Sequence, residues 1–152
     1  MKPKFFRLEE LVPPDMFKKY GRSPHYLWGM LNPLALWTAD ALRERFGTTT
    51  INSWLWGGRY KESGLRDFNT TTGAKLSQHK FGNADDCKFK NATPEEVRQD
   101  IKANPDRDCY KFITCVEEGT KTWFHFDVRN HENVEVLESG LVICRKILWV
   151  PA

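Results

Sequence analysis

The spacing of hydrophobic residues changes several times along the chain, and the first clear period belongs to a helix. Between residues 33 and 46, hydrophobic side chains recur every three or four positions, as they do on one face of a helix. Asn32 can cap this helix, Pro33 suits its first position and Gly47 suits its exit. The residues expected on its core face are Leu34, Leu36, Trp37, Ala41, Leu42 and Phe46.

A second helix is predicted by its first residues. Thr93 can act as the cap, a proline follows at the first helical position, and Glu96 completes a capping box. This helix should end near residues 104–105, where an asparagine precedes a proline. A shorter helix is expected to open at residues 13–15, within a proline-punctuated lead-in segment that covers residues 1–30.

Segments rich in β-branched and aromatic residues predict strands between and after these helices. A long glycine-containing loop over 57–74 follows the first strand, and residues 117–121 resemble the connection of a hairpin. This succession predicts an α+β fold with helices packed on an antiparallel sheet, in a single domain over 1–152. The expected strands cover residues 48–56, 84–89, 110–116, 123–128, 134–137 and 141–150.

Length and composition are typical of one globular domain with its own core. The chain has 152 residues, of which 40% are hydrophobic and 28% charged. The formal charge of +3 is too small to indicate a nucleic-acid partner. No apolar segment approaches the length of a membrane span, so we expect no membrane insertion. The sequence leaves the oligomeric state open, with a monomer favoured.

The first residues do not resemble a secretory signal. Residues 1–4 are basic, but charged residues follow in place of the apolar stretch that a signal peptide needs. We therefore expect synthesis in a cytoplasm. The four cysteines include no C-x-x-C pair, which argues against a cysteine-type zinc site and favours reduced thiols in the core.

Two short segments contain the residues with the clearest chemistry. Residues 77–86 fit the pattern S-x-H-x-x-G-x-A-x-D at every fixed position, which supplies His79 and, seven residues later, the carboxylate of Asp86. Residues 123–127 supply His125 within an aromatic strand. Two imidazoles and one carboxylate are a common ligand set for a catalytic zinc, which keeps a fourth position open for water. If these three side chains converge, the chain can hold Zn²⁺.

Alternation along the second segment predicts which side of the strand faces the site. Trp123, His125 and Asp127 fall on one face, whereas the hydrophobic residues between them fall on the other, toward the core. A fourth protein ligand would close the open position, so Asp127 is expected to orient a ligand or a substrate group. On the preceding strand, Asp85 points away from Asp86 and is the weaker candidate ligand.

Together these segments resemble the M15 peptidases, a family of zinc D-Ala-D-Ala carboxypeptidases and endopeptidases that share a fold with the hedgehog signalling domain. Many members close the metal site with a W-x-H-x-D segment, which residues 123–127 match. Residues 63–66 look like the family's S-G-x-R segment. The resemblance runs from about residue 48 to residue 129 and is closest to compact phage-encoded members. It implies the hedgehog/DD-peptidase fold, a zinc ion held by His79, Asp86 and His125, and hydrolysis of peptide bonds in peptidoglycan stem peptides.

The resemblance also implies a catalytic glutamate, and here the chain departs from the pattern. Some subfamilies place this glutamate three residues before the last histidine ligand, where this chain has Thr122. Glu117 or Glu118, across the hairpin connection, could act as base and acid in turn. We prefer Glu117, because it would lie directly opposite Thr122 if the turn is tight.

Substrate recognition is expected to rest on arginine. In the family, the arginine of the S-G-x-R segment grips a substrate carboxylate or the oxyanion, which favours Arg66 over its weaker rival Arg59 in the same loop. Ser77 is expected to offer its hydroxyl to the site or the loop backbone, and Trp123 to form a wall. The resemblance favours a phage lysis or virion enzyme that acts on the cell wall and leaves the cleaved bond open. The alternative is a non-catalytic zinc-containing binding or virion structural module of the same fold.

Overall fold

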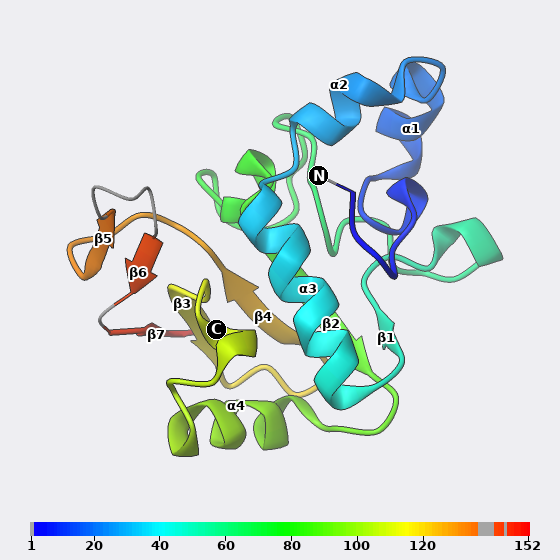
Figure 1. Ribbon diagram of the computed structural model, residues 1–152. Coiled ribbons are helices and arrows are strands. Elements are labelled where there is room, and N and C mark those ends of the chain that lie inside the picture. The colour runs from blue at the N-terminus through cyan, green and yellow to red at the C-terminus, as the bar shows by residue number, and fades with distance from the viewer. Residues whose placement is uncertain (1, 137–141, 145) are drawn as a thin grey trace.

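A five-stranded sheet with helices against one face forms the centre of the molecule (Figure 1). This computed structural model describes residues 2–136, 142–144 and 146–152. Its α-helices are α1 (Pro14–Tyr20), α2 (Pro24–Gly29), α3 (Pro33–Phe46) and α4 (Pro94–Ala103), and its short 3₁₀ helices are η1 (Leu8–Glu10), η2 (Trp54–Trp56), η3 (Gln78–Phe81) and η4 (Asp108–Tyr110). Its strands are β1 (Thr49–Thr50), β2 (Ala84–Phe89), β3 (Cys115–Glu118), β4 (Phe124–Asp127), β5 (Val134–Val136), β6 (Val142–Cys144) and β7 (Leu148–Pro151).

The sheet has the order β1-β2-β4-β3-β7, and β5 pairs with β6 in a separate two-stranded sheet. The mixed α/β class is as expected, but a purely antiparallel sheet is not what forms, because β7 pairs parallel with β3. Parallel neighbours need a long connection. The chain between β3 and β7 contains β4 and the β5–β6 pair, which provides one.

The two predicted long helices form where the capping residues indicate. The Asn32 side chain accepts a hydrogen bond from the amide of Leu34 at 2.9 Å, and α3 ends at Gly47 with φ of 82°. For α4, Thr93 and Glu96 form the reciprocal capping box, and the helix ends at Ala103. These ends are settled locally, because the side-chain caps satisfy backbone amides that the helix itself leaves unpaired.

The predicted strand over 48–56 forms only at Thr49–Thr50. Beyond it the backbone leaves the sheet and binds the segment around η1: the Asn52 amide donates to Glu10 O at 3.0 Å, and the Trp54 indole donates to Val12 O at 2.9 Å. The lead-in segment is therefore part of the core. Its buried hydrophobic residues are Phe6, Leu8, Leu11, Val12, Met16 and Leu27.

Two further strands differ in their bounds from those predicted. The strand expected over 110–116 begins only at Cys115, because Tyr110 belongs to η4 and its ring is buried. The segment 141–150 divides into β6 and β7, and the predicted ends at Leu137 and Leu141 lie outside the described residues. Among the residues that are described, no helix has both the length and the apolar character needed to cross a membrane.

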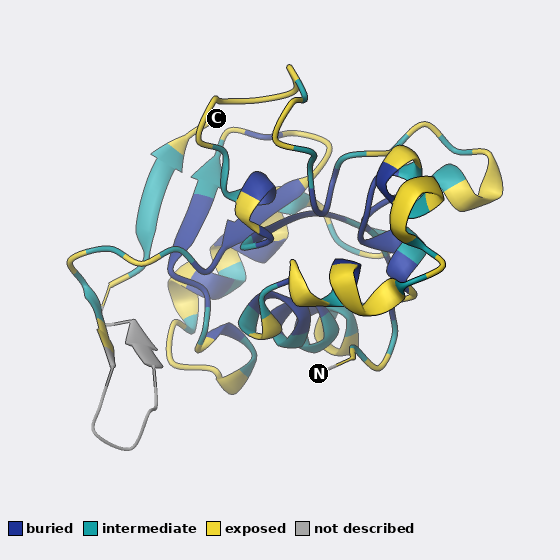
Figure 2. Cartoon of the chain, turned by 90° about the horizontal axis from the view of Figure 1, so that it is seen from above, coloured by how far each residue is buried: buried dark blue, intermediate teal, exposed yellow. Residues whose placement is uncertain are grey.

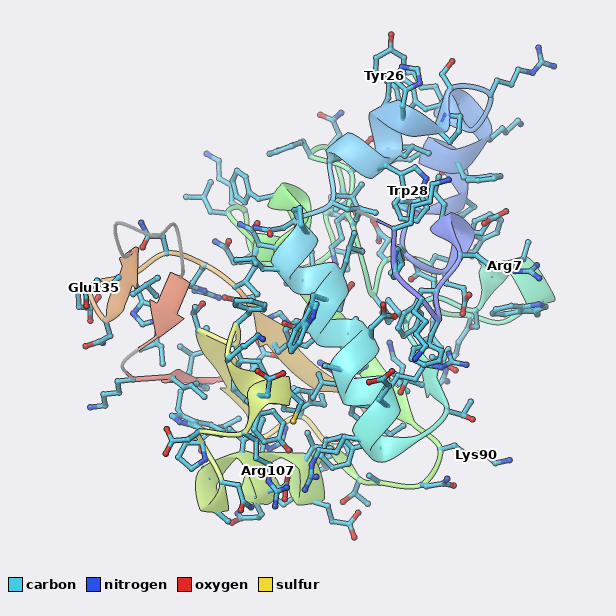
Figure 3. All side chains as sticks on the ribbon, viewed as in Figure 1. Arg7, Tyr26, Trp28, Lys90, Arg107 and Glu135 are labelled. Atoms are coloured by element: carbon cyan, nitrogen blue, oxygen red, sulfur yellow. The ribbon has the colours of Figure 1, made fainter. Side chains whose placement is uncertain are left out.

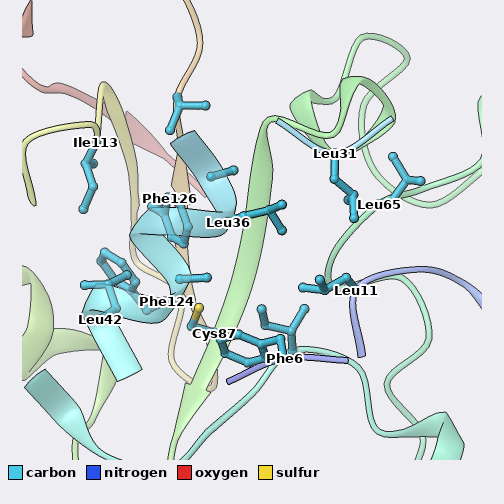
Figure 4. Close-up of a cluster of buried hydrophobic side chains, with 14 of the residues drawn as sticks. Phe6, Leu11, Leu31, Leu36, Leu42, Leu65, Cys87, Ile113, Phe124 and Phe126 are labelled. Carbon is cyan, nitrogen blue, oxygen red and sulfur yellow. The ribbon is translucent and has the colours of Figure 1, made fainter. Parts of the chain in front are cut away.

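The core lies between the sheet and the helices α3 and α4. Phe124 and Phe126 of β4 are fully buried and pack with Leu36 and Leu42 of α3 (Figure 4). Figure 2 shows buried residues along the central strands, with exposed residues on the outer side of the helices. Because neighbouring strand residues point to opposite faces, His125 and Asp127 are directed to the other side of the sheet. That side holds the candidate site.

Candidate metal centre

His79, Asp86 and His125 come together on the face of the sheet opposite α3, although 46 residues separate the two histidines in sequence. His79 Nε2 lies 3.2 Å from His125 Nδ1. Asp86 Oδ1 lies 2.9 Å from His125 Nδ1 and 3.3 Å from His79 Nε2. All three residues are buried. The structure thus brings together the three residues that the sequence predicts as metal ligands.

Strand pairing and one tight turn position these side chains. Asp86 on β2 lies directly across from His125 on β4, so both project from the same point of the sheet. His79 belongs to η3, which ends at Gly82 with φ of 69° and leads straight into β2. A Cβ at Gly82 would lie 1.9 Å from Met30 O, so the close approach of this turn to the backbone of residue 30 requires glycine.

Hydrogen bonds on the outer nitrogen of each ring fix where the lone pairs point. His79 Nδ1 lies 2.8 Å from Gly64 O, which can only accept, so this nitrogen carries the proton. His125 Nε2 lies 3.4 Å from Asp127 Oδ2 and donates toward that carboxylate. In the neutral rings, His79 Nε2 and His125 Nδ1 then direct lone pairs toward each other and toward the Asp86 carboxylate. Three electron-pair donors that face one point require a cation or a proton between them.

The dimensions of this donor set fit zinc. Tetrahedral zinc with nitrogen and oxygen ligands at about 2.0–2.2 Å has ligand atoms about 3.3–3.6 Å apart. The three observed separations of 2.9, 3.2 and 3.3 Å are close to these values. The donor set can therefore hold a metal ion.

The pKa values reflect the same competition for a positive charge. Burial lowers the pKa of His79, and its hydrogen bond with Asp86 does not offset this. Burial also acts to lower the pKa of His125, but the hydrogen bonds with Asp127 and Asp86 outweigh it and raise the pKa to about 9. For Asp86, burial opposes ionisation, yet the hydrogen bonds with both histidines hold its pKa well below the usual range. The two histidines and Asp86 thus form a site that favours a positive charge at its centre.

Asp85 is fully buried on the opposite face of β2 and takes no part in this donor set. Burial, reinforced by the neighbouring Asp86 charge, raises the pKa of Asp85 to about 7. The expectation that Asp85 points away from the site therefore agrees with the structure, since adjacent strand residues face opposite sides.

Asp127 and Arg129 form a second layer behind His125. The Asp127 side chain has no exposed surface and accepts hydrogen bonds from Arg129 Nε at 2.8 Å and Arg129 Nη2 at 2.5 Å. With its negative charge held in this way, Asp127 fixes the ring orientation of His125 through Nε2. Asp127 therefore lies where it can orient His125.

Arg66 lies beside the metal-ligand carboxylate. Its Nη2 donates to Asp86 Oδ2 at 3.0 Å, and its Nε donates to Glu62 O at 2.6 Å. The other Asp86 oxygen faces the two histidines. Arg59, the weaker candidate, is exposed and hydrogen-bonds the hydroxyl of Tyr60 at 3.2 Å. Both arginines line the same cleft, but only Arg66 reaches the centre.

The side chains of Glu117 and Glu118, which are adjacent on β3, lie on opposite faces of the sheet. Glu117 lines the cleft together with His125, whereas Glu118 forms an ion pair of 2.8 Å with Lys102 on α4. The expected tight turn that would place Glu117 opposite Thr122 does not form, because β3 continues through Glu118. The pairing of Val116 with Phe126, continued by one residue, sets Glu117 across from His125 instead.

A cleft of about 880 Å³ opens over the centre. Ser77 and Trp123 line it, as expected from the sequence, together with the exposed side chain of Leu76. Its walls come from the loop that precedes η3 and from the ends of β3 and β4. The centre therefore lies at the floor of a cleft large enough for several residues of a peptide.

The cleft residues that the sequence analysis did not propose as site residues include Ser63, Lys88 and Arg129. Lys88 Nζ donates to Ser63 Oγ at 2.5 Å, to Asp86 O at 2.9 Å and to Ile51 O at 3.3 Å, and so ties the S-G-x-R segment to the ligand strand. Alternation could have indicated Lys88, which follows Asp86 by two positions, and Arg129, which follows Asp127 by two. Ser63 belongs to the S-G-x-R segment, but its hydrogen bond with Lys88 could not be predicted from the sequence, because the two residues are 25 positions apart.

No family model matches this chain, and no curated protein and no solved structure matches it either.

Proposed function

We propose that this protein is a zinc-dependent peptidase of the M15 type, with the hedgehog/DD-peptidase fold, that hydrolyses peptide bonds in peptidoglycan stem peptides. The observation that carries the proposal is the convergence of His79, Asp86 and His125 at the floor of a cleft that Glu117 also lines. The ligand strands β2 and β4 are antiparallel neighbours, and the first histidine lies in η3, five residues before β2 begins. This arrangement is consistent with the motif order that the family resemblance implies.

Zinc, when bound, would supply a Lewis acid that polarises the scissile carbonyl and makes water nucleophilic near neutral pH. Proton transfer and the orientation of the metal ligands would fall to side chains of the protein. Glu117 takes the proton of the attacking water and then returns it to the leaving amine, which one carboxylate can do in turn. Asp127 keeps the His125 ring in the orientation in which Nδ1 faces the centre.

Arg66 would have two tasks in this mechanism. Its Nη2 holds Asp86 Oδ2, which leaves Oδ1 directed at the two histidines. Its Nη1 lies near Gly73, where a Cβ would come within 2.5 Å of it. A guanidinium in this place can offer its remaining donors to a substrate carboxylate or to the developing oxyanion.

One observation favours a second function. Thr122 occupies the position where some relatives of the proposed family carry the catalytic glutamate, and its side chain is exposed. A non-catalytic zinc-containing binding or virion structural module would tolerate this substitution. Glu117 in the cleft weighs against that alternative.

The experiment is digestion of purified peptidoglycan by the zinc-loaded protein, with and without a chelator, read by mass spectrometry. Release of a defined fragment that the chelator abolishes and zinc restores is the expected result, and the fragment identifies the bond. No release from protein that contains stoichiometric zinc would favour the non-catalytic module.

The ligand assignment has its own control. His125→Ala should remove the stoichiometric zinc, because it deletes one of three donors, whereas His25→Ala should retain it, because His25 is exposed and far from the donor set in sequence. Elemental analysis of both variants measures the difference. Full zinc retention by His125→Ala would contradict the assignment of His125 as a metal ligand.

A further inference from the structure

A second hollow, of about 440 Å³, adjoins the cleft over the metal centre. Lys88 lines both spaces, and Thr122 of the second hollow is followed directly in the chain by Trp123 of the cleft. The hollow extends from there along residues 88–94 toward the start of α4. The two spaces are therefore neighbours, with Lys88 and the Thr122–Trp123 segment at their boundary.

The hollow is positively charged. Lys90 and Lys121 line it and are both exposed, and Figure 3 shows the Lys90 side chain extending away from the ribbon. Neither lysine forms an ion pair within the described part of the chain. Glu96 also lines the hollow and accepts hydrogen bonds from the Thr93 amide at 2.6 Å and hydroxyl at 2.8 Å. These donors are neutral, so Glu96 keeps its charge, and the lining has three lysines against one carboxylate.

The positive charge continues on the cleft side of the boundary. Lys88 lies between the two spaces, and Arg59 and Lys61 are exposed among the residues that line the cleft. Glu62, Asp86 and Glu117 also line the cleft, but basic residues outnumber acidic ones around both spaces. Such an excess of positive charge attracts groups of the opposite sign. Because the chain as a whole carries a formal charge of only +3, the positive field here is a local feature.

We propose that the hollow formed by Lys88, Lys90, Lys121 and Thr122 is a subsite for a carboxylate-bearing part of the peptide substrate, beyond the bond that is cleaved. This inference rests on the proposed function and adds a substrate class to it, namely acidic peptides that extend several residues from the metal centre. Continuity with the cleft identifies the occupant, because the space is reached from the metal centre along one surface.

The strand geometry gives the distance of this subsite from the chemistry. Lys90 follows Asp86 by four residues and continues the backbone pairing of β2, since its amide donates to Thr48 O at 2.9 Å. At a rise of about 3.3 Å per residue, four residues span roughly 13 Å. A bound extended peptide covers that distance with about four residues. Short dipeptide substrates should therefore not reach the subsite.

The test compares a double variant with a matched control on the zinc-loaded protein. Lys90→Gln with Lys121→Gln removes two charges from the hollow, and Lys18→Gln with Lys19→Gln removes two from exposed positions on α1 that line neither space. Affinity for a synthetic stem peptide is measured by calorimetry, with its carboxylates free or amidated. Equal melting temperatures of the two double variants establish that folding is unaffected.

We expect the Lys90/Lys121 variant to bind the free-carboxylate peptide about three- to tenfold more weakly, as expected for two exposed charge pairs. The loss should disappear with the amidated peptide, with a dipeptide, and at about 1 M salt, where the Debye length is about 3 Å. Equal affinities for the free-carboxylate peptide in the variant and the control would overturn the proposal. The same affinities are measured with intact cell walls that carry phosphate polymers. If the double variant loses affinity for these walls but not for the peptide, the polymer is the partner and the proposal is overturned.

Binding and turnover keep the two proposals apart. If the double variant binds the free-carboxylate peptide more weakly but no chelator-sensitive cleavage is found, the proposed subsite is supported and the proposed enzymatic function is contradicted. If cleavage is chelator-sensitive but the double variant binds and cleaves long acidic peptides as the control does, the function stands and the subsite fails.

Discussion

Glu117 and Glu118 are adjacent on β3 but face opposite sides of the sheet. Glu117 lines the cleft with His125, while Glu118 pairs with Lys102 of α4 at 2.8 Å. Alternation along a strand makes this separation unavoidable once one of the two faces the site. Two neighbouring glutamates, of which the sequence analysis preferred Glu117, therefore have different surroundings.

Glu117→Gln should abolish most turnover and leave the metal bound, because the amide cannot accept the proton of the attacking water. The expected loss in kcat is about 10²- to 10⁴-fold, the usual contribution of a general acid–base group. Glu118→Gln is the matched control and should turn over nearly as fast as the wild type. Rates on a defined peptide, with zinc content measured in parallel, check both. A dead Glu118→Gln with an active Glu117→Gln would reverse the assignment.

Asp127→Asn should weaken zinc binding by about 10- to 100-fold, the usual effect of removing a carboxylate behind a histidine ligand. The amide can no longer hold the His125 Nε2 proton as firmly, and Arg129 loses its charged partner. Competition with a chromophoric chelator measures the affinity. Asp100→Asn, which alters an ion-paired carboxylate on α4, serves as the control and should leave zinc affinity unchanged. Equal affinity in both variants would show that Asp127 does not act through His125.

Gly82→Ala should destabilise the protein by about 2–4 kcal/mol, because a Cβ would meet the backbone oxygen of Met30 at 1.9 Å in addition to the cost of a positive φ. Gly57 isolates the second contribution, since its φ is 76° and a Cβ there would meet nothing within 4 Å. Gly57→Ala should cost about 1 kcal/mol. Denaturant unfolding of both variants gives the comparison. Similar losses would mean that the chain around residue 30 shifts readily.

Asp100 should contribute stability that is lost in acid. The hydrogen bonds from Arg45 hold the pKa of Asp100 below its usual range, burial opposes this shift, and the bond from the Tyr110 hydroxyl adds to it. Because the pKa of Asp100 is lower in the folded than in the unfolded state, the stabilisation is fully present above the unfolded-state pKa of about 3.9. It disappears as the pH falls through the folded-state pKa.

Asp100→Asn should accordingly cost about 1–2 kcal/mol near neutral pH, and the difference from the wild type should vanish toward pH of about 2. Asp106→Asn, at an exposed position close by, should change the free energy of unfolding by less than about 0.5 kcal/mol. Urea unfolding across this pH range measures both. A cost that stays constant down to the acid limit would contradict the ionic origin of the effect.

Local signals predicted much of the fold. The capping residues Asn32, Thr93 and Glu96 predicted where α3 and α4 begin, because caps act through bonds within one turn of the chain. Alternation predicted that Phe124 and Phe126 face the core and His125 the site. The strand over 48–56 was largely wrong, because Asn52 and Trp54 form hydrogen bonds with residues 10–12, about 40 positions earlier in the chain.

The sequence by itself indicated the three members of the donor set, since His79, Asp86 and His125 lie in two segments that resemble the metal-binding motifs of a known peptidase family. Only the tertiary structure decided that Glu117 rather than Glu118 lines the cleft, that Arg66 binds Asp86, and that Lys88 joins the cleft to a second hollow. The physical reason is the range of the interactions. Alternation is a local rule, but the pairing of β3 with β4 and the packing of α4 depend on segments far apart in the chain, and these decide which residues meet.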